Sequence, residues 1–373
     1  MTERYRVCTR CVMDTSAVDI SFNRDGACNY CSEALERLAR ASEGSAVRRA
    51  NLAALVAEIS ASGKNKRYDC VVGVSGGIDS SWVLLQAVRL GLRPLAVHMD
   101  NGWNSELAQS NIANLVNGLG VDLETHVIDW EEYRQLMRAF LDADVIDIEL
   151  LYDNALLAVN YRTAAKYGLR HIVGGTNYAT EGMRIPSDWN WFKYDKTHIR
   201  ALARRFGAVR LKTFPAIGTL NYLWFGFVKH IRWISMLNLM DYNKAYATNE
   251  LTRLYGYKPY PYKHYESIFT RFYQGYILPK KFGVDKRRVH FGSLIASGQL
   301  SREDAMRDLE SMPYPSEKAL DEDRRYFLKK IGWNESQFVA YLARPQQPHG
   351  IYGSERSLWQ ALAKLYRLAS NHP

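Results

Sequence analysis

The stretch "VVGVSGGIDSSW" (71–82) combines a valine-rich run, a glycine turn and the start of a helical pattern that continues to about residue 90. This order predicts a buried parallel strand followed by a helix. Between them, Ser75, Gly76 and Gly77 offer backbone N–H groups with little side-chain bulk. We expect both glycines to take the positive φ values that such a turn needs. With the partial positive charge of a helix N-terminus behind it, the turn predicts a phosphate cradle.

Further strand patterns lie at 93–99, 122–128 and 170–175, and helical patterns at 104–120, 130–141 and 150–168 separate them. This alternation predicts an α/β fold with a doubly wound parallel sheet, in which ligands bind beyond the carboxyl ends of strands. The candidates at the ends of the second and fourth strands are Val97, His98, Asp100, Asn101, Gly174, Gly175, Thr176 and Asn177. We expect three parts, at 1–45, 46–210 and 211–373, the last mainly helical.

Four of the five cysteines form two C-x2-C pairs, Cys8 with Cys11 and Cys28 with Cys31. Each pair presents two thiolates from one turn, and four thiolates close a tetrahedral site that suits structural zinc. A redox dithiol pair and an iron–sulfur cluster are the alternatives. We interpret residues 1–45 as a zinc knuckle that metal binding folds. Cys70 stands alone in the first strand and is interpreted as a small apolar residue.

The 373-residue chain carries a formal net charge of +10, which suits a polyanionic partner or a solvated basic surface. Its polar first residues indicate no signal peptide, and a cytoplasmic location is expected. The apolar stretch at 219–228 is too short to span a bilayer. We predict a buried core helix there, with a docking or tunnel surface as the alternative. A polar, aromatic loop at 181–198 is expected to close over the crevice.

The block from Tyr255 to Arg288 is rich in tyrosine, lysine and arginine. Aromatic faces suit a sugar or a base, and the basic side chains suit phosphate or carboxylate. A solvated basic face with ordinary tyrosines is the alternative. The tentative substrate-binding residues of this block are His264, Glu266, Lys280, Lys281, Lys286, Arg287 and Arg288. His264 and Glu266 are also acid/base candidates.

The motif "SGGIDSS" (75–81) resembles the PP-loop of ATP pyrophosphatases, which cleave ATP between the α and β phosphates. Five further motifs follow the order of a narrower family: "CTRCVMDTS" (8–16), "DGACNYC" (25–31), "VHMDNGWNS" (97–105), "VGGTNYATEG" (173–182) and the block at 262–290. Together they are similar to the WbpG-like N-acetyl sugar amidotransferases of surface polysaccharide (LPS O-antigen) biosynthesis. The resemblance extends from Cys8 to about residue 310.

The resemblance implies an ATP-dependent ligase that converts the N-acetyl group of a nucleotide-linked or acidic sugar to an acetamidino group through an adenylated intermediate. By this resemblance and by position, the pyrophosphate is assigned to Ser75, Gly76, Gly77, Ser80 and Ser81. Asp79 would orient the loop or help to hold Mg²⁺. Asp79, Ser75 and Ser80 are the catalytic candidates. Val97, His98, Asp100, Gly174, Gly175 and Thr176 are assigned to ATP, and Asn101 and Asn177 to the substrate.

No cysteine remains for glutamine hydrolysis, since four are assigned to metal and Cys70 lies in a strand. Ammonia is therefore expected from a separate glutaminase, and the resemblance implies a pair of proteins like HisH and HisF. A nucleic-acid partner is not required by the charge. The alternative function is a tRNA-modifying PP-loop enzyme of the thiolase or lysidine type. A nucleotide-binding regulatory protein without turnover is a third hypothesis.

Overall fold

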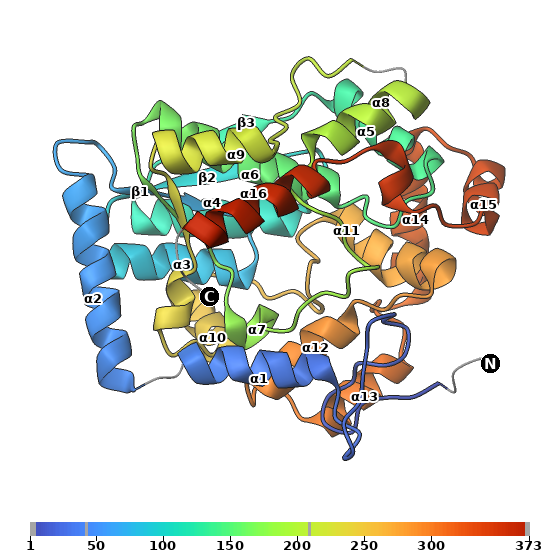
Figure 1. Ribbon diagram of the computed structural model, residues 1–373, viewed down its shortest axis with the longest axis horizontal. Helices are drawn as coiled ribbons and strands as arrows, with labels where there is room; N and C mark the ends of the chain where they lie inside the picture. The colour runs from blue at the N-terminus through green and yellow to red at the C-terminus, as the bar shows by residue number, and fades with distance from the viewer. Residues whose placement is uncertain (1–4, 42–43, 208–209, 370–373) are drawn as a thin grey trace.

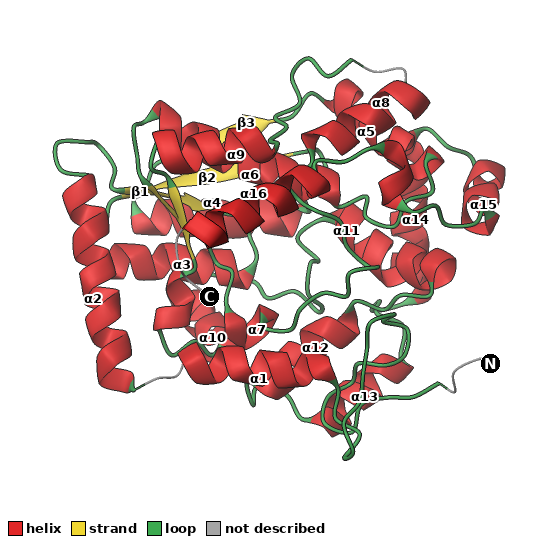
Figure 2. Ribbon diagram, in the orientation of Figure 1, coloured by secondary structure: helices red, strands yellow, loops and turns green. Residues whose placement is uncertain are grey.

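The computed structural model describes residues 5–41, 44–207 and 210–369, and it is built around a five-stranded parallel sheet (Figures 1 and 2). The strand order is β3-β2-β1-β4-β5. The strands are β1 Cys70–Gly73, β2 Pro94–Asp100, β3 Leu123–Val127, β4 His171–Val173 and β5 Arg232–Ile234. Chain order reverses direction between β1 and β4, so the loops that follow these two strands open a crevice at the switch point.

The predicted strands and helices are confirmed in type and order, and the parallel pairing confirms the predicted sheet. β1 and β2 are buried because helices cover both of their faces, whereas β3 is an edge strand with alternating exposure. β5 is a strand that the sequence pattern did not reveal. It has only three residues, too few for an alternating pattern to be recognised.

Two helical layers enclose the sheet. Buried side chains of α3 (Ile78–Arg89) and α4 (Glu106–Leu119) pack on one face together with Cys70, Val72 and Val173. Those of α5 (Trp130–Asp142) and α6 (Leu150–Lys166) pack on the other face with Val71 and Ile172. The alternation of strand residues between the two clusters is the period-two geometry of a β-strand.

Helices before and after the sheet region complete the fold. The N-terminal part contains α1 (Asn29–Ala41) and α2 (Ser45–Ser62). Between β4 and β5 lie α7 (Tyr178–Glu181), α8 (Lys196–Phe206) and α9 (Thr219–Leu223). The C-terminal region is helical, as predicted. Its α-helices are α10 Lys244–Tyr255, α11 Ile268–Phe272, α12 Arg287–Ala296, α13 Arg302–Glu310, α14 Glu317–Ile331, α15 Glu335–Ala343 and α16 Arg356–Ala369.

The prediction of a buried core helix at 219–228 is wrong. The stretch folds as the short α9 and a π-helical turn, Trp224–Val228. Phe225 is buried, but Leu220, Trp224, Phe227 and Val228 are exposed. Among the described residues, no helix combines the length and apolarity needed to cross a bilayer.

The three-part division of the chain stays a prediction. Residues 1–4 and 42–43 of the first part, 208–209 of the second and 370–373 of the third lie outside the described residues. One continuous cluster of buried side chains includes Cys8, Leu95 and Phe338, which come from all three parts.

Candidate active site at the carboxyl ends of β1 and β4

The loop after β1 is a turn of backbone N–H groups held by serine hydroxyls. Gly76 has φ +82°, and a Cβ there would lie 2.7 Å from the Ala108 carbonyl oxygen, so only glycine fits. Gly77 has φ −77°, which corrects the expectation that both glycines are left-handed. The Ser75 Oγ accepts from the Gly77 N–H at 3.3 Å, and the Ser80 Oγ accepts from the Ser75 N–H at 3.2 Å. These hydroxyls preform the cradle.

The end of β4 meets the start of α3 directly. A Cβ on Gly175 would lie 2.7 Å from the Asp79 carbonyl carbon, so glycine permits this close approach. The Asp79 Oδ1 accepts from the Tyr242 hydroxyl at 2.6 Å and from Asn177 Nδ2 and Thr180 Oγ1, both at 3.3 Å. Among the described residues, every hydrogen bond of this carboxylate is made by Oδ1, which leaves Oδ2 available to a cation. Burial raises the pKa of Asp79.

A cavity of about 450 Å³ opens beside this loop. It is lined by Ser75, Gly77, Asp79, Ser80, Gly174, Gly175 and Thr176 of the predicted set. Gly76 and Ser81 do not line it. Ser81 is buried at 2% exposure. Asn177 is also buried, and its side chain contacts Asp79 and caps α7. The structure therefore brings the ends of β1 and β4 together at one cavity.

Two lysines that were not singled out in the sequence line the same cavity. Lys263 Nζ contacts Glu181 Oε1 at 2.8 Å. Burial alone would lower the pKa of Lys263, but Glu181 and Asp79 outweigh it and raise the pKa. Lys244 lies near Lys263 and Asp79. Within the described part of the chain, the ammonium group of Lys244 has no hydrogen-bond or ion-pair partner. Burial and the neighbouring Lys263 lower the pKa of Lys244. Two cations beside a phosphate cradle suit a polyanion.

A tyrosine-rich segment, residues 257–266, covers the loop. The Tyr260 hydroxyl donates to the Gly76 carbonyl at 3.1 Å, and a Cβ on Gly77 would lie 3.3 Å from Glu266 Oε1. The turn after β2 anchors this segment, because the Ser105 N–H donates to the Glu266 carbonyl at 2.9 Å. Tyr152, Tyr257, Tyr260, Tyr262 and Tyr265 line the cavity.

The residues at the end of β2 brace that turn and do not line the cavity. His98 Nδ1 lies 2.9 Å from the Val74 carbonyl oxygen, and Asp100 Oδ1 accepts from Gly102 N–H at 2.8 Å. Asn101 is buried, with its Nδ2 3.3 Å from the Tyr133 hydroxyl. Val97 is buried in the sheet. The structure thus gives these four residues a supporting position and does not bring their side chains to the cavity.

Two histidines and a glutamate, His264, His290 and Glu266, line the cavity together with the tyrosine-rich segment. His264, at φ +65°, has its Nδ1 3.6 Å from Glu266 Oε1. Burial alone would raise the pKa of Glu266, but His264 and Lys263 lower it overall. The His264 ring centroid lies 5.0 Å from that of His290, whose Nε2 has no hydrogen-bond partner among the described residues. Burial holds the pKa of His290 well below its usual value.

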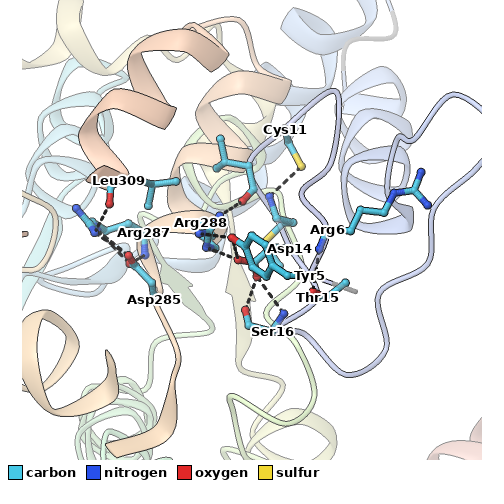
Figure 3. Close-up of polar contacts among 12 residues, drawn as sticks. Tyr5, Arg6, Cys11, Asp14, Thr15, Ser16, Asp285, Arg287, Arg288 and Leu309 are labelled. Carbon is cyan, nitrogen blue, oxygen red and sulfur yellow. Dashed lines mark hydrogen bonds and ion pairs between the residues drawn. The ribbon is translucent and has the colours of Figure 1, made fainter. Parts of the chain in front are cut away.

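The basic run at 280–288 is largely used for internal contacts, and Figure 3 shows those of Arg287 and Arg288. Lys286 lines the cavity and pairs with Glu149 at 2.5 Å. Arg287 also lines it, but its guanidinium binds Asp285 at 2.7 Å. Lys281 is buried against Asp144 at 2.9 Å. Arg288 binds Asp14 at 2.9 Å and the Val12 carbonyl, whereas Lys280 is exposed. Lys280, Lys281 and Arg288 do not line the cavity, so the substrate proposal is kept only for Lys286 and Arg287.

The loop at 181–198 is packed, not free to close. Trp189 is fully buried, and Arg184 binds Asp19 at 2.8 Å and Glu33 at 3.1 Å. Of this loop, only Glu181 lines the cavity. Burial of Trp189 and the ion pairs of Arg184 contradict the expectation of a substrate-closing loop.

The four paired cysteines come together at the N-terminus. Their sulfur atoms lie within 4.8 Å of one another, with Cys8 Sγ 3.8 Å from Cys31 Sγ and Cys11 Sγ 3.6 Å from Cys28 Sγ. Backbone N–H groups of Cys11 and Cys28 point at Cys8 Sγ, at 3.4 and 3.2 Å. All four are buried, so the set suits a closed four-thiolate metal site. The cluster is separate from the cavity lining.

Sequence reasoning missed Lys244, Lys263, Glu181, Tyr242 and Tyr152. Four of them lie within or next to helices, where a lysine or tyrosine has no local signal of function. Lys263 is the exception, because it stands in a dense Tyr-Pro-Lys segment beside His264. The density of tyrosines and lysines around Lys263 could have indicated that this residue belongs to the site.

Comparison with known proteins gives one family match. Residues 266–366 match the family described as "LPS biosynthesis protein WbpG-like, C-terminal domain". No significant match to a curated protein was found.

Among solved structures, the chain resembles NMN synthetase from Francisella tularensis at 16% identity and a TM-score of 0.30, over 62% of this chain and 92% of that one. It also resembles NH3-dependent NAD synthetase from Campylobacter jejuni at 15% identity and a TM-score of 0.29, over 59% of this chain and 100% of that one. Similarities this low say nothing about substrate.

Proposed function

We propose that this chain, whose residues 266–366 are a WbpG-like C-terminal domain and whose sheet carries a PP-loop, is an ATP-dependent ligase that converts an acetamido group of a sugar to an acetamidino group. The sugar would be nucleotide-linked or acidic, and the product would enter surface polysaccharide (LPS O-antigen) biosynthesis. We expect the reaction to take place in the cytoplasm, where ATP is supplied.

One observation carries this proposal: the phosphate cradle and the WbpG-like domain line a single cavity. Ser75, Gly77 and Gly175 come from the sheet, whereas Glu266, Gln274 and Lys286 come from the matched domain. A cavity built from both parts can place ATP beside a second substrate. Tyrosine rings along its wall suit the face of a sugar.

The chemistry needs ATP because an amide carbonyl is a poor electrophile. The acetamide oxygen attacks the α-phosphorus of ATP, the bond to the β-phosphate breaks, and pyrophosphate leaves. Ammonia then adds to the imidate carbon. The C–O bond breaks, AMP departs with the former amide oxygen, and a proton passes from the nitrogen to solvent or pyrophosphate. The protein must position the groups and exclude water.

The residues fit a triphosphate and its cation. The loop that contains Ser75 and Gly77, with Lys244 and Lys263, would hold the phosphates. Asp79 Oδ2 and the Ser80 hydroxyl are oxygen ligands of the type that Mg²⁺ prefers. When bound, Mg²⁺ would neutralise charge that develops on the departing pyrophosphate. The four clustered cysteines fit Zn²⁺ in a structural role, since their sulfurs offer the chemistry and spacing of a closed site.

A separate protein would supply the ammonia. Cys70, the one cysteine outside the cluster, is fully buried in β1, and burial raises the pKa of its thiol to about 12. It is therefore a poor nucleophile. We expect a glutaminase and cyclase-like pair, similar to HisH and HisF, as the partner.

The test incubates the pure chain with ATP, ammonium and candidate N-acetyl nucleotide sugars, and follows product mass and pyrophosphate. An acetamidino product that requires ATP and ammonium is the expected result. Glutamine alone should give none. Pyrophosphate release that depends on tRNA, with no sugar product, would favour the tRNA-modifying alternative. Nucleotide binding without pyrophosphate release would favour a regulatory protein.

A further inference from the structure

A buried asparagine on α6 belongs to the cavity lining and has an unused acceptor. Asn160 is 0% exposed, and it lines the cavity with Tyr152 and Leu156 of the same helix. These three positions are four residues apart, so they share one helix face. Within the described part of the chain, Asn160 Oδ1 has no hydrogen-bond partner. A buried polar atom left unpaired costs stability, so it calls for an explanation.

The orientation of the amide is fixed. Asn160 Nδ2 donates to the Leu156 carbonyl at 2.8 Å, and only the NH₂ end of an amide can donate to a carbonyl. The oxygen therefore points away from the helix backbone. A Cβ built on Gly73 would lie 3.0 Å from Oδ1. Gly73 is the last residue of β1, two positions before Ser75 of the phosphate cradle.

A second asparagine on α6 shows that the unpaired oxygen is not a general feature of the helix. Asn154 is also 0% exposed, yet its Nδ2 donates to the Lys193 and Ile217 carbonyls, both at 2.7 Å. Its Oδ1 accepts from the Ile217 N–H at 2.9 Å. Asn154 is thus fully paired and lies outside the cavity lining, whereas Asn160 keeps an acceptor for something that enters the cavity.

We propose that Asn160 Oδ1 binds the nitrogen donor beside the acetamide carbon, as ammonia or as an ammonium ion that passes a proton to solvent or pyrophosphate before it attacks. This inference rests on the proposed function. Oδ1 accepts hydrogen bonds, so its ligand must donate through N–H or O–H. The wall around it is formed by Leu156, Trp233 and the glycines at the ends of β1 and β4. Apart from the indole N–H of Trp233, the side chains of this wall offer no hydrogen-bond partner, which favours the smallest of the three reactants.

The position also suits the chemistry. The phosphates belong at Ser75 and Gly77, and the sugar belongs along the tyrosines. Asn160 lies between α6 and the sheet, next to the strand that leads into the cradle. A nucleophile held there approaches the activated carbon in competition with water. Losing its hydrogen bond should raise the Michaelis constant for ammonium and let water hydrolyse the activated group.

The experiment compares Asn160→Leu with Asn154→Leu and Asn160→Asp. Leucine has the same branched arrangement of heavy atoms as asparagine and suits a helix, so the Asn160 variant should fold. Its KM for ammonium should rise about tenfold to hundredfold, the loss of one hydrogen bond to a charged donor. The KM values for ATP and for the sugar should stay unchanged. The amount of amidine per pyrophosphate should fall at low ammonium.

Asn160→Asp provides the rescue. A protonated aspartic acid can donate to the Leu156 carbonyl and keep its other oxygen as an acceptor, so its ammonium KM should stay close to that of the unchanged protein. Asn154→Leu should instead lower the melting temperature and leave the ammonium KM unchanged, because three structural hydrogen bonds are lost.

Three outcomes would overturn the inference. An unchanged ammonium KM in Asn160→Leu, with a normal melting temperature, means that the oxygen binds water only. A rise confined to the KM of ATP or of the sugar assigns it to that ligand. A complete absence of ammonium-dependent product from the unaltered protein defeats the proposed function itself, and the inference with it.

Discussion

Two stretches of this sequence are suited to anions, and the structure uses them in different ways. The glycine loop at 75–81 has a single charge, that of Asp79, and four of its residues, Ser75, Gly77, Asp79 and Ser80, line the cavity. The basic run at 280–288 contains five cations, yet Lys281 pairs with Asp144 and Arg288 with Asp14. The loop with few charges forms the cradle, and the run with many charges mostly holds the protein together.

The difference follows from what fixes each group in space. A backbone turn between a strand and a helix has its geometry set locally, so its N–H groups are placed by the sequence around it. A lysine or arginine side chain is long and takes whichever acid tertiary packing provides. Charge density in a sequence therefore indicates anion binding less reliably than a glycine turn at a strand end.

The largest expected effect concerns the buried member of the basic run. Lys281→Met removes one of the two cationic partners of Asp144, the other being Arg344, and the donor to the Tyr341 and Arg344 carbonyls. The free energy of unfolding should fall by about 3 kcal/mol, since breaking a buried pair leaves polar groups uncompensated. Chemical denaturation measures it. The neighbouring exposed Lys280→Met is the control and should change little. Equal stability of the two variants would break the comparison.

Substitutions in the glycine loop at 75–81 should change the catalytic activity. Asp79→Asn should lower the rate of pyrophosphate release by about 100-fold, because the carboxylate charge that would hold the cation is lost. Steady-state kinetics at saturating ATP measures it. Ser81→Ala, in the same motif but buried and outside the cavity lining, should keep most of the activity. A near-normal rate in Asp79→Asn would show that the loop assignment is wrong.

A smaller effect concerns the cysteine cluster. Arg302 donates to the Cys8 carbonyl at 3.0 Å and to the Cys11 carbonyl at 3.1 Å. Arg302→Met should lower the melting temperature by about 4 °C, as expected for roughly 1–2 kcal/mol in a chain of this size. Arg307→Met, on an exposed part of the same helix, serves as control.

Metal removal sharpens that test. Bound zinc should be found at one ion per chain, and a strong chelator should lower the melting temperature of the unaltered protein. After chelation, Arg302→Met should no longer differ from it, because the turns that Arg302 contacts are no longer ordered. Absence of zinc, or a coloured cluster, would contradict the zinc proposal.

The smallest effect is a dependence of stability on pH. The raised pKa of Asp79 means that its ionised form is disfavoured in the folded chain. This cost is absent below the ordinary carboxyl pKa, grows as pH rises from that value to the raised pKa, and is constant above it. Asp79→Asn should therefore be more stable at neutral pH, by about 1 kcal/mol, as single stabilising changes commonly are. Thermal melts at pH 4 and pH 7 should show the advantage shrinking in acid.

The fold could be predicted where local patterns are strong. The first strand, its glycine turn and the helix after it agree in every local preference, and the alternation with helices set the parallel sheet. β5 could not be predicted because it has only three residues. The stretch at 219–228 has the composition of a core helix, but exposure is decided by what packs on it, and Phe225 is its only buried apolar side chain.

The site was predictable along the backbone and much less so in its side chains. Gly175 follows a strand end, so its place at the cavity follows from topology. Lys244 comes from α10, and its approach to the cradle depends on how that helix packs on α3. His98 sits at a strand end too, but its ring turns toward the Val74 carbonyl and braces the sheet. The direction in which a side chain points is decided by tertiary packing, which the local sequence does not reveal.

The anchoring of the cysteine turns by Arg288 and Arg302 has a consequence for synthesis on the ribosome. All four thiols are translated by residue 31, whereas Arg302 follows roughly 270 residues later. At about 5–20 residues per second, the interval is about 15–50 s. The proposed zinc ion would therefore be available to the four cysteines long before the C-terminal helices that contact their turns emerge.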